Sequence, residues 1–260
     1  MRRRVHPFDK QYFGLLREMV ISQFKLKDQR TLLGLVWSLL HPLLMLGVLF
    51  LFFRSHAGQD IKHYPVYLLI GLIHYTHFSS STGAGMVALS AMRSLTRDTV
   101  FPKEILVMSS VIANSIEFII SLLICLVLAC ITGIKLSWAS SMLPLILLLQ
   151  MMLVLWVSFI LSCCYVFVKD IGHIYQVFLR LLLFITPIFY GTAFLGEGLA
   201  KHIVSFNPLM YLINFSRLII IDGELFSARL FFLFGSLNVL LIYLGLQVFR
   251  KCEVVFAERI

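Results

Sequence analysis

Long stretches without charged side chains constrain the fold of this chain more than any other feature. Four runs contain no Asp, Glu, Lys or Arg, namely residues 31–53, 64–92, 136–168 and 230–249. Two further runs, 105–134 and 171–196, are each interrupted by a single charge. A helix needs about 20 apolar residues to cross the hydrocarbon core of a bilayer, and every one of these runs is long enough. The sequence therefore predicts six membrane-spanning segments.

The composition agrees with this prediction. Hydrophobic residues make up 60% of the chain, charged residues only 13%, and the mean hydropathy is +0.93. Soluble domains carry about 25% charged residues. Because lipid offers no partner to backbone polar groups, single apolar segments of this length must be helical. We expect an all-α membrane protein whose six transmembrane helices form one domain over residues 31–249.

The distribution of Lys and Arg predicts the orientation of the spans. Residues 1–30, 93–104, 169 and 250–260 would lie on one side of the membrane and hold 15 of the 22 basic residues. By the positive-inside rule this side is the cytoplasm, so both termini are predicted to be cytoplasmic, with 250–260 as a short tail. This placement explains the net charge of +9. No soluble domain is left to carry a nucleic-acid-binding patch, so no nucleic acid is expected as a partner.

The segment before the first span has an amphipathic helical pattern. Basic and acidic side chains lie on one side of residues 8–26, and the opposite side is apolar, with Phe8, Tyr12, Phe13, Leu15, Leu16, Met19, Val20 and Phe24. This pattern is typical of a helix lying in the membrane interface, here on the cytoplasmic side and within residues 1–30. A plain surface anchor and a gating element are both compatible with it.

Two charges fall within predicted spans, Glu117 in the third and Arg180 in the fifth. A charge at the bilayer centre costs about 2.5–3.5 kcal/mol even on the lenient insertion scale, so both should face protein or water. One interpretation is that they approach each other or line one polar passage. The alternative is that each lies nearer a membrane boundary, where its side chain reaches the polar headgroups.

The region from about residue 191 to 228 is apolar but broken by Gly, Asn, Pro and charged residues. It predicts two re-entrant half-helices before the last span, separated at Asn207 and Pro208. Backbone at that depth must be covered by protein or border a wet cavity, which favours a pore mouth over a simple loop. Asn207, Pro208 and Tyr211 are therefore candidates for an outer gate.

The second span contains SSSTGAG, residues 79–85. Small side chains allow two helix backbones to approach closely, so this stretch predicts tight helix packing. Contact with a transported substrate is the alternative interpretation.

Enzyme motifs are missing from the sequence. There is no GxxxxGK[ST], HExxH or GxSxG, and the five cysteines form no metal-ligand pattern. We therefore expect no catalytic residues, no metal and no cofactor bound by this chain. A channel or a secondary transporter remains possible, but internal repeats and several buried acids are lacking. Uphill transport would need energy from elsewhere.

Four stretches resemble those of one transporter family. They are LGLVWSLLHPLL (33–44), VFPKEIL (100–106), VKDIGHIYQVFLRLLLFITPIFY (168–190) and FNPLMYLINFSR (206–217). In order, spacing and setting they are similar to the membrane subunit of ABC-2 type exporters of O-antigen or capsular polysaccharide. The stretch KDQRT (27–31) departs from the commoner pattern of that family, in which a Tyr-Lys/Arg-Gly/Ser-Ser-like run stands at this point.

The resemblance implies a homodimer of this chain in the bacterial inner membrane, with two copies of a separate ATPase that binds ATP and Mg. The coupling helix that meets the ATPase would be about residues 94–104. Its candidate contact residues are Arg97, Asp98, Phe101, Pro102, Lys103 and Glu104.

The cargo implied by the resemblance is a lipid-linked polysaccharide, moved outward from the cytoplasm. Aromatic faces stack on sugars, so Trp37 and Tyr75 are channel candidates beside Glu117 and Arg180. Two alternatives remain: a related exporter of teichoic acid, an oligosaccharide or a drug, and an energy-independent channel.

Overall fold

The computed structural model describes residues 10–28, 36–54, 61–93, 96, 101–191 and 198–259. Within these residues every regular element is a helix. The elements are α1 (Lys10–Asp28), α2 (Val36–Phe53), α3 (Tyr64–Ala91), α5 (Glu104–Ile131), the 3-10 helix η1 (Trp138–Met142), α6 (Leu143–Phe167), α7 (Ile171–Ile185), α8 (Leu199–Ser205), α9 (Pro208–Arg217), the π-helical turn η3 (Leu218–Asp222) and α10 (Ala228–Arg259). The predicted all-α class is confirmed.

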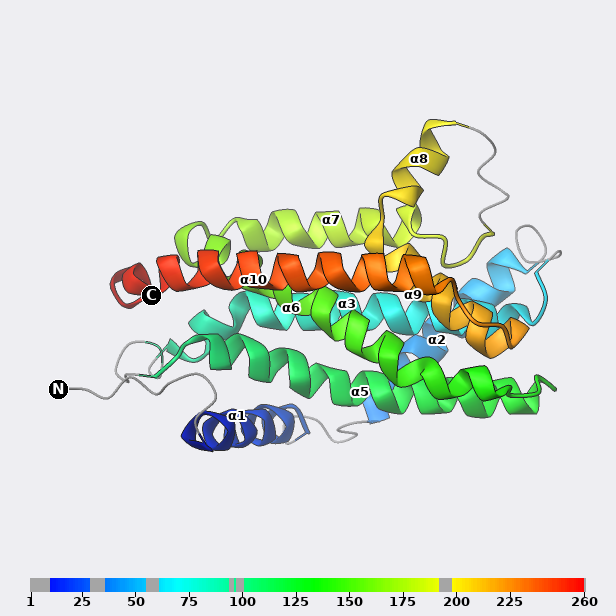
Figure 1. Ribbon diagram of the computed structural model, residues 1–260, viewed down its shortest axis with the longest axis horizontal. Helices are drawn as coiled ribbons and strands as arrows, with labels where there is room; N and C mark the ends of the chain where they lie inside the picture. Colours follow the sequence, from blue (N-terminus) through cyan, green and yellow to red (C-terminus); the bar gives the residue numbers. More distant parts are fainter. Residues whose placement is uncertain are drawn as a thin grey trace.

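The bundle is built from helices that alternate in direction. Figure 1 shows α3, α5, α6, α7 and α10 running back and forth along the long axis of the molecule, and α2 crossing obliquely beside them. The beginning of α5 and the end of α10 lie at one end of the bundle, and α8 and α9 lie toward the other. Each of these helices falls on one of the six predicted apolar runs.

Helix α3 is the centre of the bundle. It packs against α2, α5, α6, α7 and α9, and most of its side chains are buried. Its small residues permit this packing, because a Cβ atom on Gly85 would lie 2.6 Å from the Cβ of Ser158 on α6. The interpretation of residues 79–85 as a helix-packing stretch is thus supported at Gly85. By contrast, a Cβ on Gly83 would have no neighbour within 4 Å.

Three helical stretches are long and apolar enough to cross a membrane: Glu104–Ile131, Trp138–Phe167 and Ala228–Glu253. Leu40–Phe53 and Ile171–Ile185 are shorter apolar helices. Helix α3 has the length of a span, but Ser, Thr and His side chains lower its apolarity. These polar side chains are accommodated because α3 is enclosed by other helices rather than by lipid.

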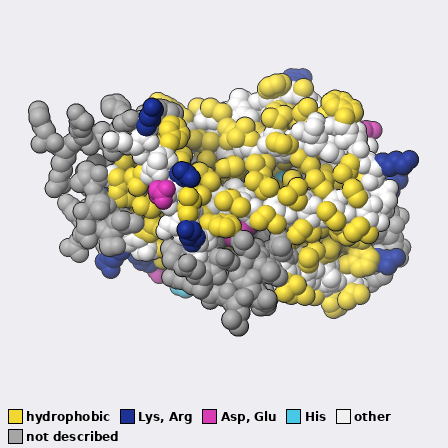
Figure 2. Space-filling view, turned by 90° about the horizontal axis from the view of Figure 1, so that it is seen from below, with side chains coloured by type: hydrophobic (Ala, Val, Ile, Leu, Met, Phe, Trp, Pro, Cys, Tyr) yellow, Lys and Arg dark blue, Asp and Glu magenta, His cyan; other side chains and the backbone are white. Residues whose placement is uncertain are grey.

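The surface has the pattern of a protein in a bilayer. Figure 2 shows one face of the molecule. Among the described residues on this face, hydrophobic side chains form a broad band, with Lys and Arg side chains toward the two ends. Large apolar side chains on α7 and α10 are strongly exposed, including Leu181 at 57% and Phe232 at 72%. A soluble monomer rarely exposes so continuous an apolar surface.

The N-terminal amphipathic pattern forms α1, which packs along the first part of α5. The amide of Gln23 donates a hydrogen bond to Ser109 Oγ at 2.8 Å. Tyr12 is buried, whereas Phe13, on the same predicted face, is 54% exposed. The helix therefore uses part of its apolar face for protein contact and leaves part uncovered.

Candidate functional site

The VFPKEIL segment is described from Phe101 onward and leads into α5. Arg97 and Asp98 lie outside the described residues. Phe101 and Pro102 are half-buried, while Lys103 and Glu104 are only 8% and 4% exposed. Charged residues are almost never buried to this degree unless they are paired. The two charges of the segment therefore need partners inside the molecule.

The end of α10 supplies charged groups that meet this turn. Arg250 Nη2 lies 3.1 Å from Glu104 Oε1, forming an ion pair in which the Arg side chain is 47% exposed. Glu253 Oε1 accepts a hydrogen bond of 3.2 Å from the backbone N–H of Lys103. Lys103 is the N-cap residue of α5 and makes no side-chain capping bond. Glu253 thus caps α5 from another helix, where its negative charge also suits the helix dipole.

A small hydrophobic core lies beneath these contacts. Phe249 and Phe256 on α10 are fully buried and pack with residues from α3, α5 and α6. Phe101 of the segment packs against the same cluster. Residues 250–259, predicted as a tail, are helical as the continuation of α10. We call this region, which includes the charged residues Lys103, Glu104, Arg250 and Glu253, the charged end of the bundle.

Two features of its surroundings shift the pKa of Lys103 in opposite directions. Burial lowers the pKa of the Lys103 ammonium, and the carboxylate of Glu253 partly offsets this by raising it. The net effect is a lowered pKa.

At the opposite end, the chain breaks where the sequence predicts. Helix α8 stops at Ser205 and α9 starts at Pro208, with Asn207 between them as the N-cap. The Asn207 side chain accepts from the backbone N–H of Leu209 at 3.0 Å and donates to Thr186 Oγ1 at 2.7 Å. Pro208 takes the first helical position, where its missing N–H costs nothing. Two short helices are confirmed here.

Tyr211 belongs to the same corner. Its hydroxyl donates to the carbonyl of Ser205 at 2.9 Å, which ties α9 back to α8. Its ring packs on Phe234 of α10, with centroids 6.1 Å apart. All three outer-gate candidates therefore hold the α8–α9 corner together.

Arg217, at the end of α9, is the most heavily bonded side chain at this end. Its guanidinium donates to the carbonyls of Tyr67, Pro187 and Ile188 at 2.8–3.3 Å. Its Cζ also lies 3.3 Å from the centre of the Tyr67 ring. The residue is only 5% exposed, although the charge count placed it in an outer loop. Gly71 makes room for it, since a Cβ there would lie 3.1 Å from Nη2.

A neutral polar network lies in the interior next to Arg217. His74 of α3 bonds through Nδ1 to Gln150 Oε1 of α6 at 3.1 Å, and through Nε2 to Ser216 Oγ of α9 at 2.8 Å. The Gln150 amide returns a bond to the His74 carbonyl at 3.2 Å. All three side chains are fully buried. The network joins three helices at one point, so its role is structural.

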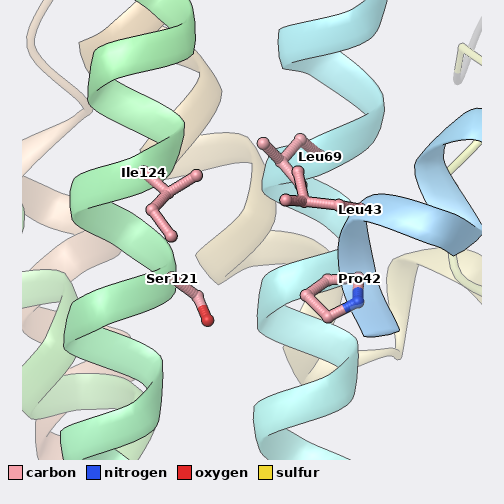
Figure 3. Close-up of a pocket in the computed structure, with 5 residues that line it drawn as sticks. All are labelled: Pro42, Leu43, Leu69, Ser121 and Ile124. Atoms are coloured by element: carbon pink, nitrogen blue, oxygen red, sulfur yellow. The ribbon is translucent and has the colours of Figure 1, made fainter. Parts of the chain in front are cut away.

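The cavity in Figure 3 lies between α2, α3 and α5 and is lined by Pro42, Leu43, Leu69, Ser121 and Ile124. Its volume is about 10 Å³, which is room for a single water molecule. A sugar ring does not fit there. Among the described residues, no group of three His, Cys, Asp or Glu side chains is placed to hold a metal ion.

Comparison with known families decides the identity of the fold. The family model described as "ABC-2 type transporter" matches residues 15–221, which is most of the chain. This chain belongs to the ABC-2 type transporter family. It is therefore a transport component, the permease subunit of an ABC-2 transporter.

Curated relatives of this ABC-2 type transporter align over nearly their full length. The O-antigen export system permease protein RfbA of Myxococcus xanthus is 30% identical over 251 residues, covering 96% of each chain. Two proteins of the same name from Klebsiella pneumoniae are 27% and 25% identical over 248 residues, covering 95% of each chain. The similarity thus includes both the VFPKEIL segment and the α8–α9 corner.

The channel candidates of this ABC-2 type transporter are not gathered in one place. The side chain of Trp37 lies outside the described residues. Tyr75 ties α3 to α7 by donating to the Leu179 carbonyl at 2.7 Å. Arg180 is exposed on α7, whereas Glu117 is half-buried on α5. Figure 1 shows α7 and α5 at opposite edges of the bundle, so the fold does not bring these two charges together within one chain.

Sequence reasoning missed Arg250, Glu253, His74, Gln150 and Ser216, and treated Arg217 only as a loop charge. One signal was available for Gln150, which is the only Gln, Asn or His in the uncharged run 136–168. A lone polar amide in such a run indicates a buried partner on another helix. The partners of Glu104 and Lys103 carry no comparable local signal, because they lie about 150 residues further along the chain.

Proposed function

We propose that this chain is the membrane subunit of an ATP-driven exporter that moves a lipid-linked polysaccharide, of O-antigen or capsular type, from the cytoplasm across the bacterial inner membrane. The observation that carries the proposal is the end-to-end similarity to relatives named O-antigen export permeases, at up to 30% identity over 96% of both chains. The partners would be a second copy of this chain and two copies of a separate ATPase, which binds ATP and Mg.

The proposed topology has six spans with both termini in the cytoplasm. Six helices that alternate in direction support it, as does the excess of Lys and Arg on the side of the charged end. In this orientation α8 and α9 form a re-entrant pair near the outer face. Asn207 donates to the hydroxyl of Thr186, and Arg217 donates to the carbonyls of Pro187 and Ile188. These bonds attach the pair to the segment after α7, which supplies protein cover at that depth.

The export passage would form between two copies of the chain. The cavity of about 10 Å³ between α2, α3 and α5 cannot admit a sugar chain, and the exposed apolar faces of α7 and α10 are free to meet lipid or a second copy. In this arrangement Arg180, exposed on α7, is available to the passage, and Trp37, Tyr75 and Glu117 remain channel candidates.

The first part of the coupling helix would receive the ATPase. Phe101 and Pro102 are half-buried and so retain surface for contact, whereas Lys103 and Glu104 face the protein. We therefore assign docking to the first part of the coupling helix, including Arg97 and Asp98, and internal attachment to its second part.

The test combines copurification with an export assay in the native host. The chain is tagged, extracted in mild detergent, and its companions identified, and a strain lacking it is assayed for polysaccharide at the cell surface and inside. A stoichiometric ATPase together with cargo retained inside the deletion strain is the expected result. Cargo reaching the surface with a catalytically inactive ATPase would instead identify an energy-independent channel. Normal surface polysaccharide in the deletion strain would point to another cargo, such as an oligosaccharide or a drug.

A further inference from the structure

The attachment of the coupling segment to α10 suggests how movement reaches the membrane, an inference that rests on the function proposed above. Two neighbouring contacts join the coupling segment to α10: the Glu104–Arg250 ion pair at 3.1 Å, and the hydrogen bond from the Lys103 N–H to Glu253 at 3.2 Å. Arg250 and Glu253 are three residues apart, so they lie on neighbouring positions of one helix face. The segment therefore has a two-point attachment to the last helix.

The attachment is firm on the side of α10. Phe249 and Phe256, on either side of Glu253, are fully buried in the core of the charged end. Leu106 and Val107 of α5 belong to the same core. A displacement of the Lys103–Glu104 turn cannot leave α10 in place without breaking both polar contacts and this packing.

Helix α10 extends from the charged end to the α8–α9 corner. Its 32 residues are unbroken, which corresponds to a rod of about 48 Å at 1.5 Å per residue. At its far end Phe231 stacks on Phe226 with ring centroids 4.8 Å apart, and Phe226 packs on Phe215 of α9 at 5.0 Å. Phe234 contacts Tyr211, one of the outer-gate candidates. One rigid element thus touches both ends.

We propose that Arg250 and Glu253 are positioning residues that fasten the coupling segment to α10, so that movement imposed by the ATPase is passed along α10 to the α8–α9 corner. Neither residue has to touch cargo or nucleotide. Their loss should leave ATPase binding and ATP hydrolysis in place and separate them from export. Because the Arg250 side chain is 47% exposed but that of Glu104 only 5%, the yield of assembled complex is measured for each variant alongside its export.

The first test combines two measurements: export in the host, and ATP hydrolysis by the purified complex with its ATPase. Their ratio gives the export per ATP hydrolysed. Arg250→Glu is expected to lower this ratio by at least about tenfold, within the usual range of coupling between sites. Lys251→Glu is the matched control, since Lys251 is exposed one residue away and undergoes the same charge change. Equal ratios in the two variants would overturn the proposal.

Glu253 provides an independent comparison. Glu253→Gln retains an oxygen that can accept from the Lys103 N–H, whereas Glu253→Ala does not. The Gln variant should keep most of the wild-type ratio and the Ala variant should lose it. A purely structural role would instead lower the amount of assembled complex in proportion to the loss of export. Export that falls only in step with complex yield would therefore refute the positioning role.

The second test observes the far end of α10 directly. Ser236 is exposed there, and Ser236→Cys can carry a spin label in a chain whose Cys130, Cys164 and Cys252 are replaced by alanine. The label-to-label distance between the two copies should change on adding Mg-ATP and vanadate, and this change should be absent in Glu253→Ala. A change of wild-type size in Glu253→Ala would overturn the inference. A wild-type complex without an ATPase or a second copy would instead contradict the proposed function.

Discussion

At the charged end, the carboxylate of Glu104 meets a guanidinium that stands half in solvent, whereas at the opposite end the guanidinium of Arg217 is almost fully enclosed among backbone carbonyls. The two arginines therefore differ in what their removal costs. Because solvent screens Arg250, its pair with Glu104 contributes on the order of 1 kcal/mol, although Glu104 itself is buried. A buried cation that satisfies three carbonyls contributes several times more, because each hydrogen bond to a charged group is worth about 1.5–3 kcal/mol.

This difference matches different mechanical tasks. An ion pair that stands half in solvent adds little to folding stability, so its task can be to fasten the coupling segment to α10 while the complex moves. A buried cation bonded to fixed backbone groups resists displacement and suits an anchor. We therefore assign the transmission of movement to the charged end, and rigidity to the contact between α9, α3 and the end of α7. If this assignment is right, substitutions at Arg217 should destabilise the fold far more than substitutions at Arg250.

Arg217→Met should have the largest effect. Replacing a buried ionic group by an apolar one is often harmless, but here it would strand the carbonyls of Pro187 and Ile188, which lie beyond the end of α7. We expect a loss of unfolding free energy on the order of 3 kcal/mol. Thermal unfolding in detergent measures it, with the exposed Arg229→Met as control. Equal midpoints for the two variants would show that Arg217 is no anchor.

Gly85→Ala tests the packing that brings α3 and α6 together. The added Cβ would lie 2.6 Å from Ser158 Cβ, and overpacking of this kind costs about 1–3 kcal/mol. Gly83→Ala is the matched control, because the added Cβ would meet no neighbour within 4 Å. The only effect expected there is the higher helix propensity of Ala, which stabilises the fold by up to about 1 kcal/mol. The two variants should therefore shift the unfolding midpoint in opposite directions. Ser158→Gly should restore part of the stability of Gly85→Ala, and failure to do so would place the cost elsewhere.

Features governed by local physics were predictable from the sequence. Runs free of charge form helices because lipid leaves the backbone no other partner, and the break before Pro208 follows from the Asn207 cap and the ring of proline. Contacts between distant helices were not predictable. Glu104 and Arg250 are 146 residues apart, and His74 and Ser216 are 142 apart. A single sequence shows which residues are polar, but not which of them a three-dimensional packing brings together.

Gln150→Leu should have an intermediate effect. It removes the bonds between Gln150 and His74 while keeping the side chain's approximate size. We expect a loss of about 1–2 kcal/mol, against no loss for Gln247→Leu on the exposed face of α10. If the three side chains act as a network, the effects of Gln150→Leu and Ser216→Ala should not add, with a coupling of at least about 0.5 kcal/mol in a double-mutant cycle. Additive effects would show that the bonds of Gln150 and Ser216 are independent of each other.

Arg250→Gln should have the smallest effect on stability, although Arg250→Glu is expected to impair export strongly. The ion pair with Glu104 is screened by solvent on the arginine side, so the loss should stay below about 1 kcal/mol. The midpoints of Arg250→Gln and wild type should also converge as salt is added, because screening weakens the pair. A salt-independent loss as large as that of Arg217→Met would show that Arg250 is a second anchor. A small, salt-sensitive loss, together with uncoupled ATP hydrolysis in Arg250→Glu, would support the distinction between the two arginines, because residues important for movement need not be important for folding.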